Sequence, residues 1–159
     1  MDAEKLLKER RSIREYRDKK VDKETLEKII EIARYAPSGN NVQPWEIIAI
    51  TDEEKLDKIK SLDDQRNYPA CFGVFLKDGD HYLKDGSNLS TYIMLAAKSQ
   101  GLGSCWINIS EQEAIDEIKN MLNIPENYKY VSLISIGYFD ENPAVEKRST
   151  DDLIHWEEF

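Results

Sequence analysis

The sequence predicts one layered domain built from both helices and strands, of the α/β or α+β class. Two observations predict it. Segments with the helical spacing of apolar residues alternate along the chain with short apolar runs that are typical of strands. The 159 residues contain no internal repeat, low-complexity tract or linker, and a chain of this length folds as a single domain that buries roughly two-thirds of its unfolded surface. The domain is therefore expected to span residues 1–159, and periodicity alone does not decide between the two classes.

Two helices are expected in the first part of the chain. Residues 2–10 predict a short helix. A stronger helix is expected from Asp22, which can act as its N-cap, to about Tyr35. The apolar face of this helix consists of four residues at helical spacing: Leu26, Ile29, Ile30 and Ala33. Pro, Ser, Gly and two Asn within residues 36–44 end it.

Two strands and a helix are expected next. Residues 45–50 (WEIIAI) predict a strand, because they are rich in Ile and too few for a helix. Thr51 and Glu54 have the spacing of a capping box, for a helix that ends near Lys60. A second short apolar run, residues 71–76, predicts another strand.

The most apolar helix of the chain is expected over residues 86–100. Small residues interleave with its large apolar ones, so we expect this helix to be central and buried. Gly101 follows at the position where a left-handed residue ends a helix. Residues 104–108 (SCWIN) predict a third strand.

The last part of the chain predicts a helix, a long strand and an extended tail. Ser110 and Glu113 form a second capping-box pattern, for a helix that ends near Leu122. Residues 130–139 (YVSLISIGYF) predict the fourth strand. Residues 140–159 have no clear period and predict an extended tail.

Charge and composition exclude several classes of protein. With 22 Lys+Arg against 31 Asp+Glu and a formal net charge of -9, general affinity for nucleic acid or anionic membranes is not expected. The N-terminus is charged where a signal peptide is apolar, and the longest apolar run, residues 92–97, is too short to span a membrane. Cys71 and Cys105 lack a CxxC spacing and are expected to be reduced, buried thiols. The cytoplasm is therefore the expected compartment.

Several site types are also not expected. The chain has no GxxxxGK[ST] motif, and its GLGSC stretch follows a helix and not a strand, which is the wrong context for a dinucleotide-binding turn. His81 and His155 have no partners at metal-ligand spacing, so no metal site is expected. Three acidic pairs lie in polar stretches and are interpreted as solvated charge: Asp63 and Asp64, Asp151 and Asp152, Glu157 and Glu158.

Three stretches carry residues suited to ligand chemistry. Residues 8–20 contain seven basic and three acidic residues in an otherwise acidic chain, and arginine forks match phosphate oxygens two at a time. The alternative is a basic helix end paired with nearby Glu. The polar loop 37–45 could read the edge of a planar heterocycle, or be a plain connection. The stretch 101–108 could present backbone N–H groups to a flat ligand, or be a core strand.

Taken together and in this order, these motifs resemble the FMN-dependent nitroreductase family. The resemblance rests on RRSIREY, APSGNNVQPWEIIAI, YPACFGVFLKD, the LAAKSQGLGSCWI block and KRSTDDLIHW, and runs from about Leu6 to the C-terminus. It implies an α+β layered fold with a central mixed sheet flanked by helices. It also implies a homodimer whose C-terminal arm extends to the partner, with one FMN in each of two interface sites. By this resemblance the chain would be a compact member of the family, because the span 60–68 is shorter than usual for it.

The resemblance implies four groups of cofactor-binding residues. One grips the phosphate, ribityl and pyrimidine end of FMN: Arg10, Arg11, Ser12 and Arg14. A loop contacts the flavin largely from the other subunit: Pro37, Ser38, Gly39, Asn41 and Gln43. A strand lies on one flavin face: Cys105, Trp106 and Ile107. A basic pair closes over the phosphate: Lys147 and Arg148.

The activity that the resemblance implies is an FMN-dependent NAD(P)H oxidoreductase with ping-pong hydride transfer through flavin N5. The acceptor would be a small molecule such as a nitroaromatic or a quinone. Arg14 is the candidate for stabilising reduced flavin, and no catalytic acid is assigned, because Asn108 stands where some members carry one. Three alternatives stay open: dehalogenation, enone or free-flavin reduction on the same fold, a flavin-binding sensor or reservoir without turnover, and an acidic interaction module. No motif discriminates NADH from NADPH.

Overall fold

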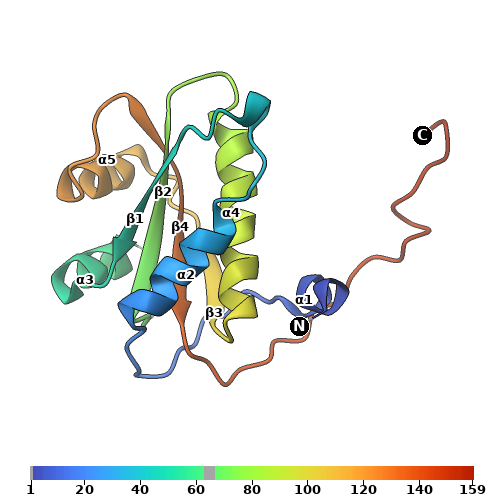
Figure 1. The fold of residues 1–159 in the computed structure, drawn as a ribbon, viewed down its shortest axis with the longest axis horizontal. Helices are drawn as coiled ribbons and strands as arrows, with labels where there is room; N and C mark the ends of the chain where they lie inside the picture. Colours follow the sequence, from blue (N-terminus) through green and yellow to red (C-terminus); the bar gives the residue numbers. More distant parts are fainter. Residues whose placement is uncertain (1, 63–66) are drawn as a thin grey trace.

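A sheet of four strands lies at the centre of the part of the chain described by the computed structural model, residues 2–62 and 67–159 (Figure 1). Its strands are β1 (Trp45–Ile50), β2 (Ala70–Lys77), β3 (Gly103–Ile107) and β4 (Tyr128–Gly137). They are ordered β1-β2-β4-β3. Each expected strand is confirmed to within a few residues, because each is a short apolar run with turn residues on both sides.

Neighbouring strands of this sheet pair antiparallel. The expected α+β class is confirmed, whereas the mixed sheet is reduced to one parallel bridge in the described chain, between Ser12 and Ser104. This parallel pairing is short because the N-terminal segment turns away from β3 after Ile13. The Arg14 backbone N–H donates to the Glu141 carboxylate and not to β3.

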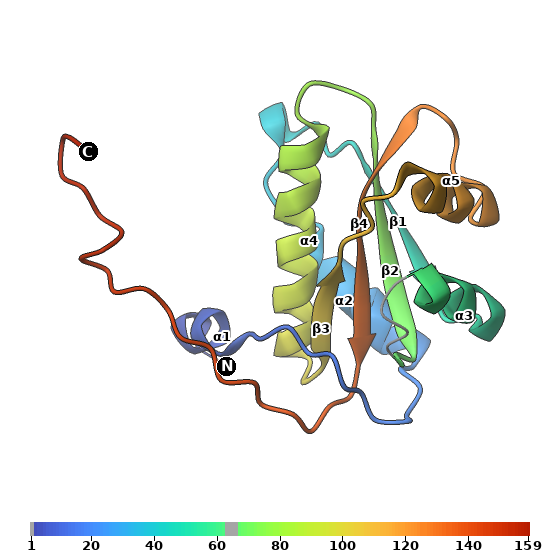
Figure 2. The same ribbon diagram turned by 180° about the vertical axis from the view of Figure 1, so that it is seen from behind.

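Helices cover both faces of the sheet (Figures 1 and 2). The helices on one face are α2 (Lys23–Ala33) and α4 (Tyr82–Ser99), and those on the other are α3 (Glu53–Leu62) and α5 (Gln112–Met121). Each face has its own core: Phe72, Ile93 and Ile134 pack on the α4 side, and Phe75, Ile118 and Leu133 pack on the other. The short α1 (Ala3–Glu9) contacts α4.

Two of the expected signals at helix boundaries are confirmed, one at the start of α2 and one after α4. The Asp22 carboxylate accepts a hydrogen bond of 2.8 Å from the Thr25 N–H and caps α2. After α4, Gly101 has a φ of +78° and its N–H donates to the Lys98 carbonyl, while the Leu102 N–H donates to the Ala97 carbonyl. This is the Schellman arrangement that a left-handed glycine permits.

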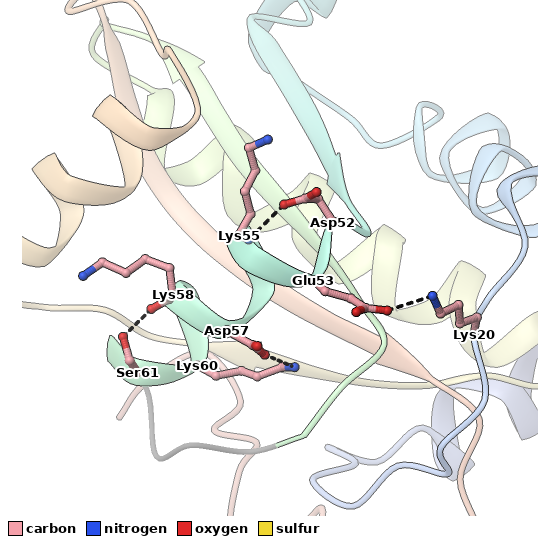
Figure 3. Close-up of polar contacts among 8 residues, drawn as sticks. All are labelled: Lys20, Asp52, Glu53, Lys55, Asp57, Lys58, Lys60 and Ser61. Atoms are coloured by element: carbon pink, nitrogen blue, oxygen red, sulfur yellow. Dashed lines mark hydrogen bonds and ion pairs between the residues drawn. The ribbon is translucent and has the colours of Figure 1, made fainter.

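Both expected capping boxes are wrong. Asp52, not Thr51, caps α3, because its carboxylate accepts from the Lys55 N–H at 3.0 Å (Figure 3). At α5 the N-cap is Glu111, and the Ser110 hydroxyl donates to the Glu111 carboxylate instead of capping the helix.

Helix α4 is longer than expected, and the tail is extended. Helix α4 begins at Tyr82 and not at the expected Gly86. Residues 140–159 contain no helix or strand, as expected. The first of them contact the N-terminal part of the chain, and the rest extend away from the domain (Figure 1). Within the described ranges, no helix combines the length and the apolar character needed to cross a membrane. Asp63 and Asp64, and with them part of the shortened span 60–68, lie outside the described residues.

Candidate functional site

The basic segment, residues 10–14, lies against the start of β3 (Figure 2). The Ile13 N–H donates to the Ser104 carbonyl at 2.9 Å. Gly103 makes this approach possible, because a Cβ at Gly103 would lie 2.8 Å from the Ile13 side chain. The RRSIREY motif is thus hydrogen-bonded to the GLGSC stretch, although about ninety residues separate the two in the sequence.

The chain that follows β4 holds the other side of the basic segment. The Glu141 carboxylate accepts from the backbone N–H groups of Arg14 and Glu15. Arg17 donates to the Asp140 carboxylate through two nitrogens, and this hydrogen bonding lowers the pKa of Asp140 below its ordinary value. Arg17 is therefore committed to a protein contact, whereas the Arg14 guanidinium is exposed and has no hydrogen-bond partner among the described residues.

Tyr16 links the basic segment to strand β4. Its hydroxyl donates to the Ile13 carbonyl at 2.7 Å and hydrogen-bonds with the Ser135 hydroxyl of β4 at 2.7 Å. Burial raises the pKa of the Tyr16 phenol well above its ordinary value. The folded protein therefore keeps this phenol protonated to a higher pH than the unfolded chain does.

We expect this phenol to make the protein less stable in alkali. Its stabilisation is complete below the unfolded pKa of about 10 and is lost as the pH rises above that value. The free energy of unfolding, measured by urea titration between pH 9 and pH 11.5, should fall less steeply for Tyr16→Phe than for the wild type. Parallel falls in the two proteins would show that Tyr16 ionises equally in both states.

A pocket lies between the basic segment, the end of α4 and the start of β3. Three cations and one carboxylate line it, namely Arg10, Arg11, Lys98 and Glu9, together with Ser104 and Asn142. Arg11 uses one terminal nitrogen to donate to the carbonyls of Lys8 at 2.6 Å and Arg10 at 2.9 Å. Its Nε is buried and has no hydrogen-bond partner within the described residues.

The unpartnered Nε of Arg11 indicates what fits this pocket. A buried guanidinium N–H without an acceptor is costly, so such groups are almost always paired. The excess positive charge of the pocket favours an anionic acceptor, and a phosphate group can accept from several guanidinium nitrogens at once. The charges and donors of the lining residues therefore suit the phosphate end of a nucleotide cofactor, while the pocket itself encloses about 10 Å³, the space of one water molecule.

The amide loop, residues 37–43, lies on the first turns of α4. The Gly39 N–H donates to Asp85 Oδ1 at 3.1 Å, and the Asn88 side-chain amide donates to the Pro37 carbonyl at 3.3 Å. Within the loop, the Gln43 N–H donates to Ser38 Oγ at 2.9 Å. Asn41 and Gln43 are exposed, and the Gln43 side-chain nitrogen donates to the Asn41 carbonyl at 3.1 Å. The Asn41 amide and the Gln43 amide oxygen are therefore accessible to a ligand.

The basic segment and the amide loop lie at opposite ends of α4 (Figure 1). Asp85 anchors the loop and Lys98 lines the pocket, thirteen positions further along the same helix. At 1.5 Å per residue, the two are about 20 Å apart. One protomer therefore does not bring these two predicted groups together.

The other predicted residues have different surroundings. Cys105 and Ile107 are 2% and 1% exposed, so their side chains belong to the core, while Trp106 is half-buried against the α2 and α4 side of the sheet. A ligand could contact this strand only through its backbone or through Trp106. Lys147 and Arg148 are exposed in the tail, and the Arg148 guanidinium donates to the Asp152 carbonyl.

Lys98 and Asp85 are among the site residues that were not expected from the sequence. Lys98 is the only charged residue of the helix expected over residues 86–100, and that isolation was the available signal. Asp85 precedes the expected start of that helix, so nothing in the sequence placed it beside the loop. No group of three or more His, Cys, Asp or Glu side chains in the described ranges could hold a metal ion.

The chain is similar to several proteins that are named nitroreductases. It matches the sequence profile of the Nitroreductase family over residues 7–81 and 77–138. A protein from Methanothermobacter thermautotrophicus, provisionally named NADH dehydrogenase/NAD(P)H nitroreductase, is 32% identical over 100% of this chain and 88% of its own. An Archaeoglobus fulgidus protein of the same provisional name is 32% identical over 98% and 97%. The solved structure of an FMN-dependent nitroreductase from Clostridium difficile has a TM-score of 0.84 and 34% identity, over 97% and 98%.

Proposed function

Because the chain belongs to the nitroreductase family, we propose that it takes electrons from NAD(P)H, uses FMN as its cofactor and reduces a small acceptor such as a nitroaromatic or a quinone. Two relatives are named for NAD(P)H-dependent nitroreduction and the solved structure for FMN-dependent nitroreduction, which supports the class of FMN-dependent oxidoreductases. The observation that carries the proposal is the buried, unpartnered Arg11 Nε in a pocket with Arg10 and Lys98.

We propose that the protein is a homodimer with a flavin site at each end of the subunit interface. The separation of about 20 Å along α4 supports this arrangement, because a second copy packed antiparallel along α4 would place its amide loop beside the basic segment of the first. Each site would then combine the phosphate pocket of one subunit with the amides of the other.

The chemistry that FMN supplies when bound is acceptance of a hydride from a nicotinamide and its return as two electrons to an acceptor. Arg10 and Arg11 would bind the phosphate and fix the position of the ring system. The exposed Arg14 guanidinium would add positive charge near the pyrimidine end, which favours any additional negative charge there. Asn41 and Gln43 of the second subunit would orient the ring edge by hydrogen bonds. Donor and acceptor would use one pocket in turn, which predicts ping-pong kinetics.

Purified protein is expected to be yellow and to lose its visible absorbance when NADH or NADPH is added without oxygen. Acceptors that restore the colour identify the reaction, so the panel should contain a nitroaromatic, a quinone, an enone, an iodinated phenol and free flavin. Stopped-flow absorbance measures both half-reactions separately. A colourless preparation that does not respond to added FMN would contradict the proposal, and flavin that NAD(P)H fails to reduce would favour a flavin reservoir.

A further inference from the structure

Asp85 is an unusual carboxylate because it is buried. It is 7% exposed in the first turn of α4, and no other Asp, Glu, Lys or Arg in the described ranges is buried. Acidic side chains are rarely buried unless they are paired, yet no described cation forms an ion pair with Asp85. Within the described ranges, its side chain accepts a hydrogen bond from the backbone N–H of Gly39 in the amide loop. The position in the first helical turn also favours a negative charge.

The amide loop has a backbone that needs support. Asn40, Asn41 and Gln43 have φ values of 49°, 57° and 52°, all in the left-handed region. That region is unfavourable for residues with a side chain, although Asn tolerates it better than most. Three such residues within four positions are therefore stable only where surrounding contacts fix them.

Besides the hydrogen bonds within the loop, the supporting contacts come from helix α4. Asp85 accepts from Gly39, and the Asn88 amide donates to the Pro37 carbonyl. The loop backbone lies directly on the first turn of α4, because a Cβ at Gly39 would be 3.5 Å from the His81 ring and 3.9 Å from Asp85 Oδ2. Asn88 is exposed, so the buried, charge-assisted bond to Asp85 is the stronger of the two.

We propose that Asp85 is a positioning residue for the flavin site: through the Gly39 N–H it fixes the amide loop in the conformation that presents Asn41 and Gln43 to the flavin of the second subunit. This inference rests on the proposed function. It assigns no contact between Asp85 and the flavin, since the carboxylate lies beneath the loop and acts through its backbone.

The test compares three variants with the wild-type holoprotein. Asp85→Ala removes the acceptor, Asp85→Asn keeps an acceptor oxygen of the same reach, and Asp80→Ala removes an exposed carboxylate nearby as the matched control. FMN affinity is measured by quenching of flavin fluorescence, and ring placement by the visible circular dichroism of bound FMN, both well below each melting temperature. Asp85→Ala should bind FMN about tenfold or more weakly and change the dichroism. Asp85→Asn and Asp80→Ala should stay close to the wild type.

Two outcomes separate a failure of this inference from a failure of the proposed function. If Asp85→Ala melts at a lower temperature but keeps the FMN affinity and dichroism of the wild type, Asp85 is merely structural and the inference is overturned. If Asp85→Ala does not fold, Asp85→Ser replaces it, because the shorter hydroxyl does not reach Gly39, and the same criteria apply. If the wild type itself binds no FMN, the proposed function fails, and the inference about the flavin fails with it. Amide hydrogen exchange at Gly39, expected to be faster in Asp85→Ala, then shows whether the contact itself exists.

Discussion

Arg10→Ala is expected to weaken FMN binding by about 10- to 100-fold, because a hydrogen bond between charged groups contributes about 1.5–3 kcal/mol. Arg10 lines the pocket beside the unpartnered Arg11 Nε, and its own guanidinium has no hydrogen-bond partner among the described residues. Removing it therefore breaks no side-chain hydrogen bond or ion pair of the described chain. The melting temperature of the apoprotein should change little, so that the loss can be assigned to the ligand.

Riboflavin distinguishes the phosphate from the rest of the cofactor in this experiment. It has the same ring and ribityl chain but no phosphate, so Arg10→Ala should leave riboflavin affinity almost unchanged. Lys20→Ala is the matched control, since it removes one positive charge from a surface ion pair with Glu53, away from the pocket (Figure 3). Equal losses for FMN and riboflavin, or no loss for either, would show that Arg10 does not bind the phosphate.

The parts of the fold that were predictable are those fixed by local chemistry. The Asp22 cap, the glycine after α4 and the apolar runs of the strands depend on residues within one or two turns of each other. The failures were also local, but they were choices between near-equivalent neighbours. At α3, Asp52 stands next to Thr51, and the carboxylate is the better acceptor at a helix N-terminus. The direction of the strands leaves no trace in periodicity, so the antiparallel sheet needed the structure.

The candidate site was predictable only in part, for a different reason. The density of arginine within residues 10–17 indicated an anion-binding site, but not which of these arginines are available to bind the anion. Arg17 forms its ion pair with Asp140, 123 positions away, and Lys98 joins the pocket from the far end of a helix. Contacts of this range are invisible to any local pattern. Only the folded chain shows that α4 separates the amide loop from the basic segment.

The arrangement of the site across two subunits makes a prediction for mixed dimers. One chain carries Arg10→Ala with Arg11→Ala, and the other carries Ser38→Ala with Gln43→Ala in the amide loop. Each variant alone should form dimers with two defective sites. In a mixed dimer, one site would receive both defective parts and the other would receive both intact parts. Dual affinity tags isolate the mixed species, and dimers that combine each variant with wild-type chains are the controls.

The most direct test of the account is therefore the FMN content of that mixed dimer. If each flavin is held by the basic segment of one subunit and the amide loop of the other, the mixed dimer should bind one FMN per dimer with wild-type affinity and recover NAD(P)H-dependent reduction. If both parts of a site come from the same subunit, every site carries one defect. The mixed dimer would then bind FMN as weakly as the two parent variants, and the account would be contradicted.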